Sequence, residues 1–110
     1  MGYYSNVNIV SEKALLKDYD VLNQKIKELE YNNDIVFDEF GNAETSEESF
    51  KRYDDAKLAE LISNYLIRGS IELYYIGEDG ERWGWKVLPK HTVKLKAVIS
   101  YIPEKMEEMK

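Results

Sequence analysis

The chain has 110 residues, 44% of them apolar and 13% aromatic, and a formal net charge of −6; this balance excludes disorder and predicts one domain over residues 1–110. The absence of cysteine excludes a disulfide framework, a thiolate nucleophile and a cysteine-ligated metal. The short apolar runs exclude a membrane span, which needs about 20 apolar residues, and the N-terminus lacks the pattern of a secretory signal, so we expect a cytoplasmic protein.

The first third of the chain predicts a strand followed by a helix. Residues 3–10 alternate and end in β-branched side chains, which is typical of a strand. Ser11 stands at the position of a helix N-cap, and apolar residues recur every three or four positions from Leu15 to Leu29. We therefore expect a helix that starts after Ser11, ends near residues 32–33 and packs its apolar side on a sheet.

The middle of the chain predicts a second strand and a second helix. Residues 34–40 are rich in strand formers and are closed by Gly41, while residues 43–49 are polar and acidic and predict a surface loop. An apolar stripe at helical spacing predicts the second helix over about residues 53–67. Gly69 follows it, as expected for a helix end.

The last third of the chain predicts a β-meander. Alternating runs at residues 71–76, 82–88 and 93–101 are separated by turns at residues 77–80 and 89–91. Trp83 and Trp85 lie two apart and should project into the core on the same side. The order is then β-α-β-α-β-β-β, which predicts an α+β fold with a mainly antiparallel sheet and two helices on one face, a variant of the ferredoxin-like arrangement.

The sequence offers no constellation for catalysis. His91 is the single histidine and lies in a predicted turn. The carboxylates lie in predicted loops, turns and polar faces, so none is expected to form the pair of differently buried acids that acid–base chemistry requires. We therefore expect no enzyme activity, no catalytic residue, no cofactor and no metal site.

The acidic charge is concentrated between residues 28 and 60, where eleven acids and three bases give a net charge of −8. A block of one sign attracts basic surfaces and repels nucleic acid. We expect a partner protein with a basic surface, while membrane binding is not expected and a homodimer is left open. The predicted partner-binding residues are Asp38, Glu39, Glu44, Glu47, Glu48, Asp54 and Asp55.

An alternative function is a nucleic-acid-binding module on the outer face of the meander. Cations and an aromatic side chain alternate with the tryptophans there, and such a face could contact phosphates and stack a base. The overall acidity argues against it. Its contacts would be Tyr74, Arg82, Lys86, Lys94 and Lys96.

Three short motifs resemble a group of small, largely uncharacterised bacteriophage and prophage proteins. These motifs are the opening Gly2-Tyr3-Tyr4-Ser5, the helix entry at residues 51–54, and the Gly-Glu-rich hairpin that leads to Trp83. The resemblance implies an origin in a phage and a location in the cytoplasm of an infected or lysogenic bacterium. Acidic phage proteins of this size are often inhibitors of host nucleases or other defence machinery, including anti-CRISPR proteins. The resemblance therefore implies a non-enzymatic inhibitor of a host nucleic-acid-handling or defence protein.

Overall fold

The structure is a computed structural model and describes residues 4–29, 35–45, 50–51, 55–77 and 79–96. Its helices are α1 (Tyr19–Lys27) and α2 (Asp55–Tyr65). Its strands are β1 (Tyr4–Leu16), β2 (Val36–Phe37), β3 (Ala43–Glu44), β4 (Phe50–Lys51), β5 (Leu66–Gly77), β6 (Arg82–Leu88) and β7 (His91–Lys96).

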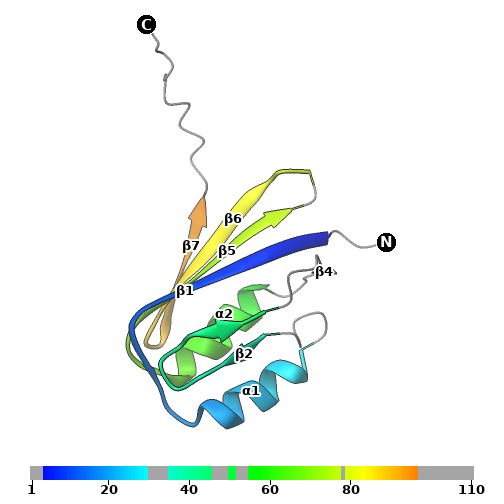
Figure 1. The fold of residues 1–110 in the computed structure, drawn as a ribbon. Helices are drawn as coiled ribbons and strands as arrows, with labels where there is room; N and C mark the ends of the chain where they lie inside the picture. The colour runs from blue at the N-terminus through cyan, green and yellow to red at the C-terminus, as the bar shows by residue number, and fades with distance from the viewer. Residues whose placement is uncertain (1–3, 30–34, 46–49, 52–54, 78, 97–110) are drawn as a thin grey trace, which may run out of the picture.

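Five of the strands form one sheet in the order β4-β1-β5-β6-β7, and every neighbouring pair in it is antiparallel. Both helices and the small β2–β3 ribbon lie beneath one face of this sheet (Figure 1). The predicted α+β class, with two helices and a mainly antiparallel sheet, is confirmed. The ferredoxin-like arrangement stays a prediction.

The start of the first helix was predicted wrongly. β1 continues through Ser11 as far as Leu16, so Ser11 is a strand residue rather than an N-cap, and α1 begins only at Tyr19. Of the helical stripe expected from Leu15 to Leu29, the buried members in α1 are Leu22 and Ile26. Leu15, at the end of β1, happens to continue the helical spacing of the apolar residues in α1. The predicted helix was therefore longer than α1.

A β-bulge explains why β1 was hard to read. Lys13 has a φ of 53°, and the register between β1 and β5 shifts between Glu12 and Leu15. On the opposite strand Gly69 has a φ of 78°, and a Cβ there would lie 2.2 Å from the carbonyl oxygen of Lys13, so only glycine fits. The bulge exchanges the side of the strand that points inward. The buried residues are Ser5 and Val7 before it, and Ala14 and Leu16 after it.

Residues 35–45 form a hairpin instead of adding a strand to the main sheet. Within the described part of the predicted strand 34–40, only Val36 and Phe37 are extended, and they pair with β3 in a separate two-stranded ribbon. The tight turn that follows includes Gly41 at a φ of 77° and reverses the chain at once. The second predicted strand is thereby corrected to two residues that pack in the helical layer, where Ile35 and Phe37 are buried.

The hydrophobic core lies between the sheet and this second layer. The face of the sheet that points to the helices, here called the inner face, contributes residues from β1, β5 and β6. Trp83 and Trp85 are half-buried and pack against the core from this face, so the prediction that they lie on one side is confirmed. The fully buried side chains are Leu22, Ile26, Ile35, Leu58, Ala59, Ile62, Ile71, Leu73 and Val87.

The turn between β6 and β7 is shorter than predicted. Leu88 pairs with His91, which leaves only Pro89 and Lys90 in the turn. Lys90 has a φ of 59°, as the third position of a type II turn requires after proline. A two-residue turn places Val93 opposite Lys86 on the side away from the helices. Val93 therefore lies on the face opposite to the tryptophans.

Candidate interaction surfaces

The two tryptophans of β6 donate to a single carboxylate oxygen at the start of α2. The Nε1 atoms of Trp83 and Trp85 lie 3.1 and 2.7 Å from Oδ2 of Asp55. The ring of Tyr75 stacks on Trp83 with centroids 5.3 Å apart. Half-buried indoles require an acceptor, so Asp55 fastens α2 to the sheet. This internal role removes Asp55 from the predicted partner-binding set.

The other predicted acidic residues are distributed along the β2–β3 hairpin and beyond it. Asp38, Glu39 and Glu44 are exposed. The carboxylate of Asp38 accepts hydrogen bonds from the backbone N–H groups of Phe40 and Asn42, at 2.9 and 3.0 Å, and so holds the turn. The remaining members, Glu47, Glu48 and Asp54, lie outside the described residues.

The turn Asp38–Asn42, here called the hairpin tip, is anchored to both β1 and α1. The backbone N–H of Leu16 donates to the carbonyl oxygen of Glu39 at 2.8 Å. The side-chain amide of Asn23 makes two hydrogen bonds to the backbone of Phe37, both at 2.9 Å. These bonds fix the hairpin without covering its end.

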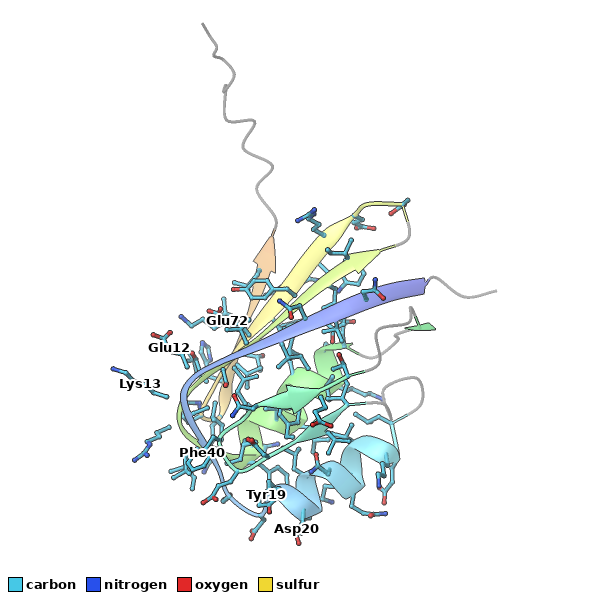
Figure 2. The ribbon with its side chains drawn as sticks, in the orientation of Figure 1. Glu12, Lys13, Tyr19, Asp20, Phe40 and Glu72 are labelled. Atoms are coloured by element: carbon cyan, nitrogen blue, oxygen red, sulfur yellow. The ribbon has the colours of Figure 1, made fainter. Side chains whose placement is uncertain are left out.

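Phe40 is the most exposed large apolar residue among those described, with 56% of its surface accessible. It projects at the bent end of the sheet, near Lys13 (Figure 2). Its neighbour Glu39 presents a carboxylate beside it. Phe40 was not predicted as a contact residue because it fell within the predicted second strand, residues 34–40. The signal in the sequence was the Asp-x-x-Gly-Asn run, which is typical of a turn that leaves the residue before glycine exposed.

The opposite face of the sheet, here called the outer face, is covered by neither of the described helices (Figure 1). Its described residues include Asn6, Asn8, Val10, Glu12, Glu72, Tyr74, Ile76, Arg82, Gly84, Lys86, Val93 and Leu95. Within this set two acids stand against two bases.

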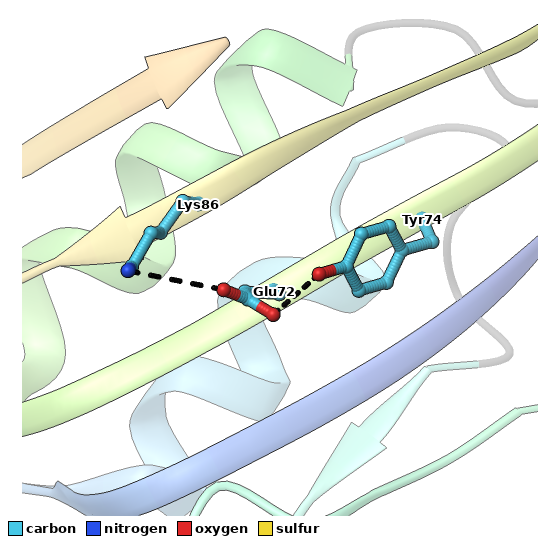
Figure 3. A network of polar contacts seen from close by, with 3 residues as sticks. All are labelled: Glu72, Tyr74 and Lys86. Atoms are coloured by element: carbon cyan, nitrogen blue, oxygen red, sulfur yellow. Dashed lines mark hydrogen bonds and ion pairs between the residues drawn. The ribbon is translucent and has the colours of Figure 1, made fainter. Parts of the chain in front are cut away.

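A polar network crosses the middle of the outer face (Figure 3). The hydroxyl of Tyr74 donates to Oε1 of Glu72 at 2.5 Å, and Nζ of Lys86 lies 3.9 Å from Oε2 of the same carboxylate. The hydrogen bond to Glu72 raises the pKa of Tyr74 above its usual value of 10.0, because the phenol proton is held by an anion. Burial and the charge of Glu72 raise it further.

Next to this network the outer face is hollowed where β6 carries Gly84. The hollow has a volume of about 450 Å³, and Asn8, Tyr74, Arg82 and Leu95 are among the residues that line it. A Cβ at Gly84 would lie 2.5 Å from the carbonyl oxygen of Leu73. Any larger residue at this position would force the strands apart. Because Gly84 has no side chain, the outer face is hollow at this point.

The five residues of the predicted nucleic-acid face do not lie together. Tyr74, Arg82 and Lys86 are on the outer face, but Lys94 pairs with Trp85 and places its Nζ 5.5 Å from the centre of that indole ring, on the inner side. The register likewise places position 96 opposite Trp83. The expected cationic face is corrected to two bases, one of which pairs with Glu72.

Within the described ranges, no three His, Asp or Glu residues are grouped as metal ligands. None of the helices found there is long and apolar enough to cross a membrane. Comparisons with protein families, with curated proteins and with solved structures gave no match.

Proposed function

We propose that this chain is a non-enzymatic binding protein that uses the hairpin tip to occupy a basic surface of a partner protein. The observation that supports it is an exposed aromatic side chain, Phe40, next to an exposed carboxylate, Glu39, on a turn held by hydrogen bonds. Aromatic residues are enriched in the centres of protein interfaces. A turn that is already ordered loses little conformational entropy on binding.

The chemistry of the tip selects the class of partner. Asp38, Glu39 and Glu44 are exposed acids of the hairpin, and the 28–60 segment of the sequence has a net charge of −8, an excess of negative charge that would steer a positively charged protein into contact. Proteins that handle nucleic acid carry such basic grooves, because they neutralise phosphates. We therefore propose that the partner is a nucleic-acid-handling or defence protein of a bacterial host and that occupation of its groove inhibits it.

The proposal is tested by affinity capture from a bacterial lysate with matched variants as bait. Phe40→Ala removes the aromatic contact and Glu39→Lys reverses the charge, and both residues are exposed, so the fold should persist. The controls are Ile67→Ala, at 52% exposure on β5, and Glu60→Lys on the exposed side of α2. Capture is compared at about 50 mM and about 500 mM salt, because screening shortens the reach of charge.

We expect the unaltered chain and both controls to retain a basic protein at low salt, and both tip variants to lose it. A single-stranded or duplex oligonucleotide should then compete with the chain for the captured protein. Equal retention by all baits would show that the hairpin tip is not the contact. Retention without competition by nucleic acid would reject the inhibition of a nucleic-acid site.

A further inference from the structure

The outer face is apolar at positions where a monomer would expose polar side chains. Val10, Ile76 and Val93 are each at least 40% exposed, and Ile76, Tyr74 and Leu95 line the hollow over Gly84. The described helices and the hairpin cover the inner face, and no described element covers the outer face (Figure 1). Sheets with one apolar face are usually stabilised by packing that face against another element.

The charge of this face differs from that of the rest of the molecule. The protein has a net charge of −6, but the outer face carries Glu12 and Glu72 against Arg82 and Lys86. An acidic protein can approach a second copy of itself here without facing a layer of like charge. A basic partner or nucleic acid would gain little from a face with balanced charge, so the charge pattern favours a second copy.

Of these four charges, Glu72 and Lys86 pair in the middle of the face, and the other two lie at its opposite ends. Arg82 pairs with Ile76 next to the β5–β6 turn, whereas Glu12 pairs with Ser70 beside the bulge. When two copies meet face to face with their strands running in opposite directions, Arg82 of each copy approaches Glu12 of the other. This reciprocity is what a twofold interface requires.

The area is sufficient for a weak specific dimer. β1, β5, β6 and β7 together contain 38 residues, and at roughly 3.3 Å per residue and 4.8 Å between strands they give a face of about 600 Å², of which about 480 Å² lies outside the bend. Two copies would bury about 950–1,200 Å², which is at the lower limit for a specific interface. The hollow over Gly84 would receive side chains of the second copy and improve the fit.

We propose that the chain forms a twofold homodimer through the outer face, with the two sheets packed against each other. The helical layers and the hairpin tips then point away from the interface on both sides. This dimer is independent of the proposed contact at the hairpin tip, and each can fail without the other.

The experiment compares two valines that differ mainly in their location. Val10 on the outer face is 45% exposed and pairs with Glu72; Val36 on the hairpin is 44% exposed and pairs with Glu44. Val10→Lys and Val36→Lys therefore make the same change on a strand, at equal exposure and beside a glutamate. Val93→Glu adds a charge of opposite sign on the outer face, where its neighbour across the strand is Lys86.

Sedimentation velocity of the full chain from about 5 to 500 μM measures the association, and urea unfolding checks that each variant is folded. We expect the unaltered chain and Val36→Lys to show a concentration-dependent dimer. Val10→Lys and Val93→Glu should each weaken it by about tenfold or more, because a charge would be buried at the interface.

The charges introduced by Val10→Lys and Val93→Glu have opposite signs. The pair therefore distinguishes the effect of a buried charge on dimerisation from the effect of the protein's net charge. If repulsion between acidic molecules controlled association, Val10→Lys would strengthen it. A monomer at every concentration would overturn the proposal and leave the outer face for a different protein. A dimer that Val36→Lys disrupts and Val10→Lys leaves intact would overturn it equally and place the interface on the helical layer.

Discussion

The inner and outer faces of β6 belong to one strand of seven residues and differ in what they contact. Trp83, Trp85 and Val87 point to the helices, where the tryptophans donate to Asp55 and Val87 is fully buried. Arg82 and Lys86 point the other way, to a face that no described element covers. The difference predicts that substitutions two positions apart in β6 act alike on stability and that substitutions at neighbouring positions do not.

The largest loss of stability is expected from a substitution on the inner face. Leu73→Ala removes a fully buried side chain of β5 and should lower the free energy of unfolding by about 2–5 kcal/mol. Ile76→Ala, on the outer face of the same strand, should cost less than about 1 kcal/mol. Urea unfolding at low micromolar concentration measures both. Equal losses would mean that the outer face is also buried under these conditions.

The second prediction concerns the carboxylate that serves both indoles. Asp55→Ala leaves two half-buried N–H donors without their acceptor and should cost about 1–3 kcal/mol. Asp55→Asn keeps an acceptor oxygen and should lose less. Asp20→Ala is the control, since Asp20 is the acid in the first turn of α1 and its removal affects only the helix dipole, by about 0.3–1 kcal/mol.

Urea unfolding and tryptophan emission are the measurements for this series. The emission of Asp55→Ala should move towards longer wavelengths as water reaches the indoles. If Asp55→Ala and Asp20→Ala lose the same stability and leave the emission unchanged, the hydrogen bonds to Asp55 contribute nothing measurable.

The smallest effect is expected on the outer face. Glu72→Gln should lower the pKa of Tyr74 towards its usual value, because the negative acceptor that holds the phenol proton is lost. The folded pKa is raised, so the corresponding stability is present at neutral pH and is lost as the pH rises above about 10, where the unfolded chain begins to release this proton. Tyrosinate absorbance, with Tyr74→Phe subtracted in each background, measures the shift. An unchanged titration would show that the hydrogen bond does not form in solution.

Local patterns were sufficient to predict the α+β class and the side on which the tryptophans lie. Residues 71–77 of β5 alternate in burial, and the pairing with β6 places Tyr75 opposite Trp83 on the same face. The helical stripe of α2 was predicted correctly at Leu58 and Ile62, which are buried. The end of this helix was predicted wrongly, because α2 stops at Tyr65 and Gly69 lies within β5.

The rest depended on contacts between distant residues. The bulge at Lys13 exists because Gly69 lies opposite it, some fifty residues away in the chain. The position of Lys94 depended on a turn of two residues where three were expected. A turn that is one residue shorter moves every following side chain of the strand to the other face of the sheet. Lys94 therefore lies on the inner face and not on the predicted nucleic-acid face. Asp55 was read as a surface charge because the sequence does not show that two indoles approach it.

The pairing of β1 with β5 has a consequence for the order in which the chain folds. Ser5 pairs with Gly77, and Leu16 pairs with Leu66, whereas β5, β6 and β7 are joined by short turns. Hairpins form in about 1–10 μs, but closing a long loop loses more chain entropy before any contact offsets it. The three-stranded meander should therefore form first and β1 should join it last. During synthesis β1 cannot complete its pairing until Gly77 has been added to the chain, and we expect the docking of β1 to set the folding rate of the sheet.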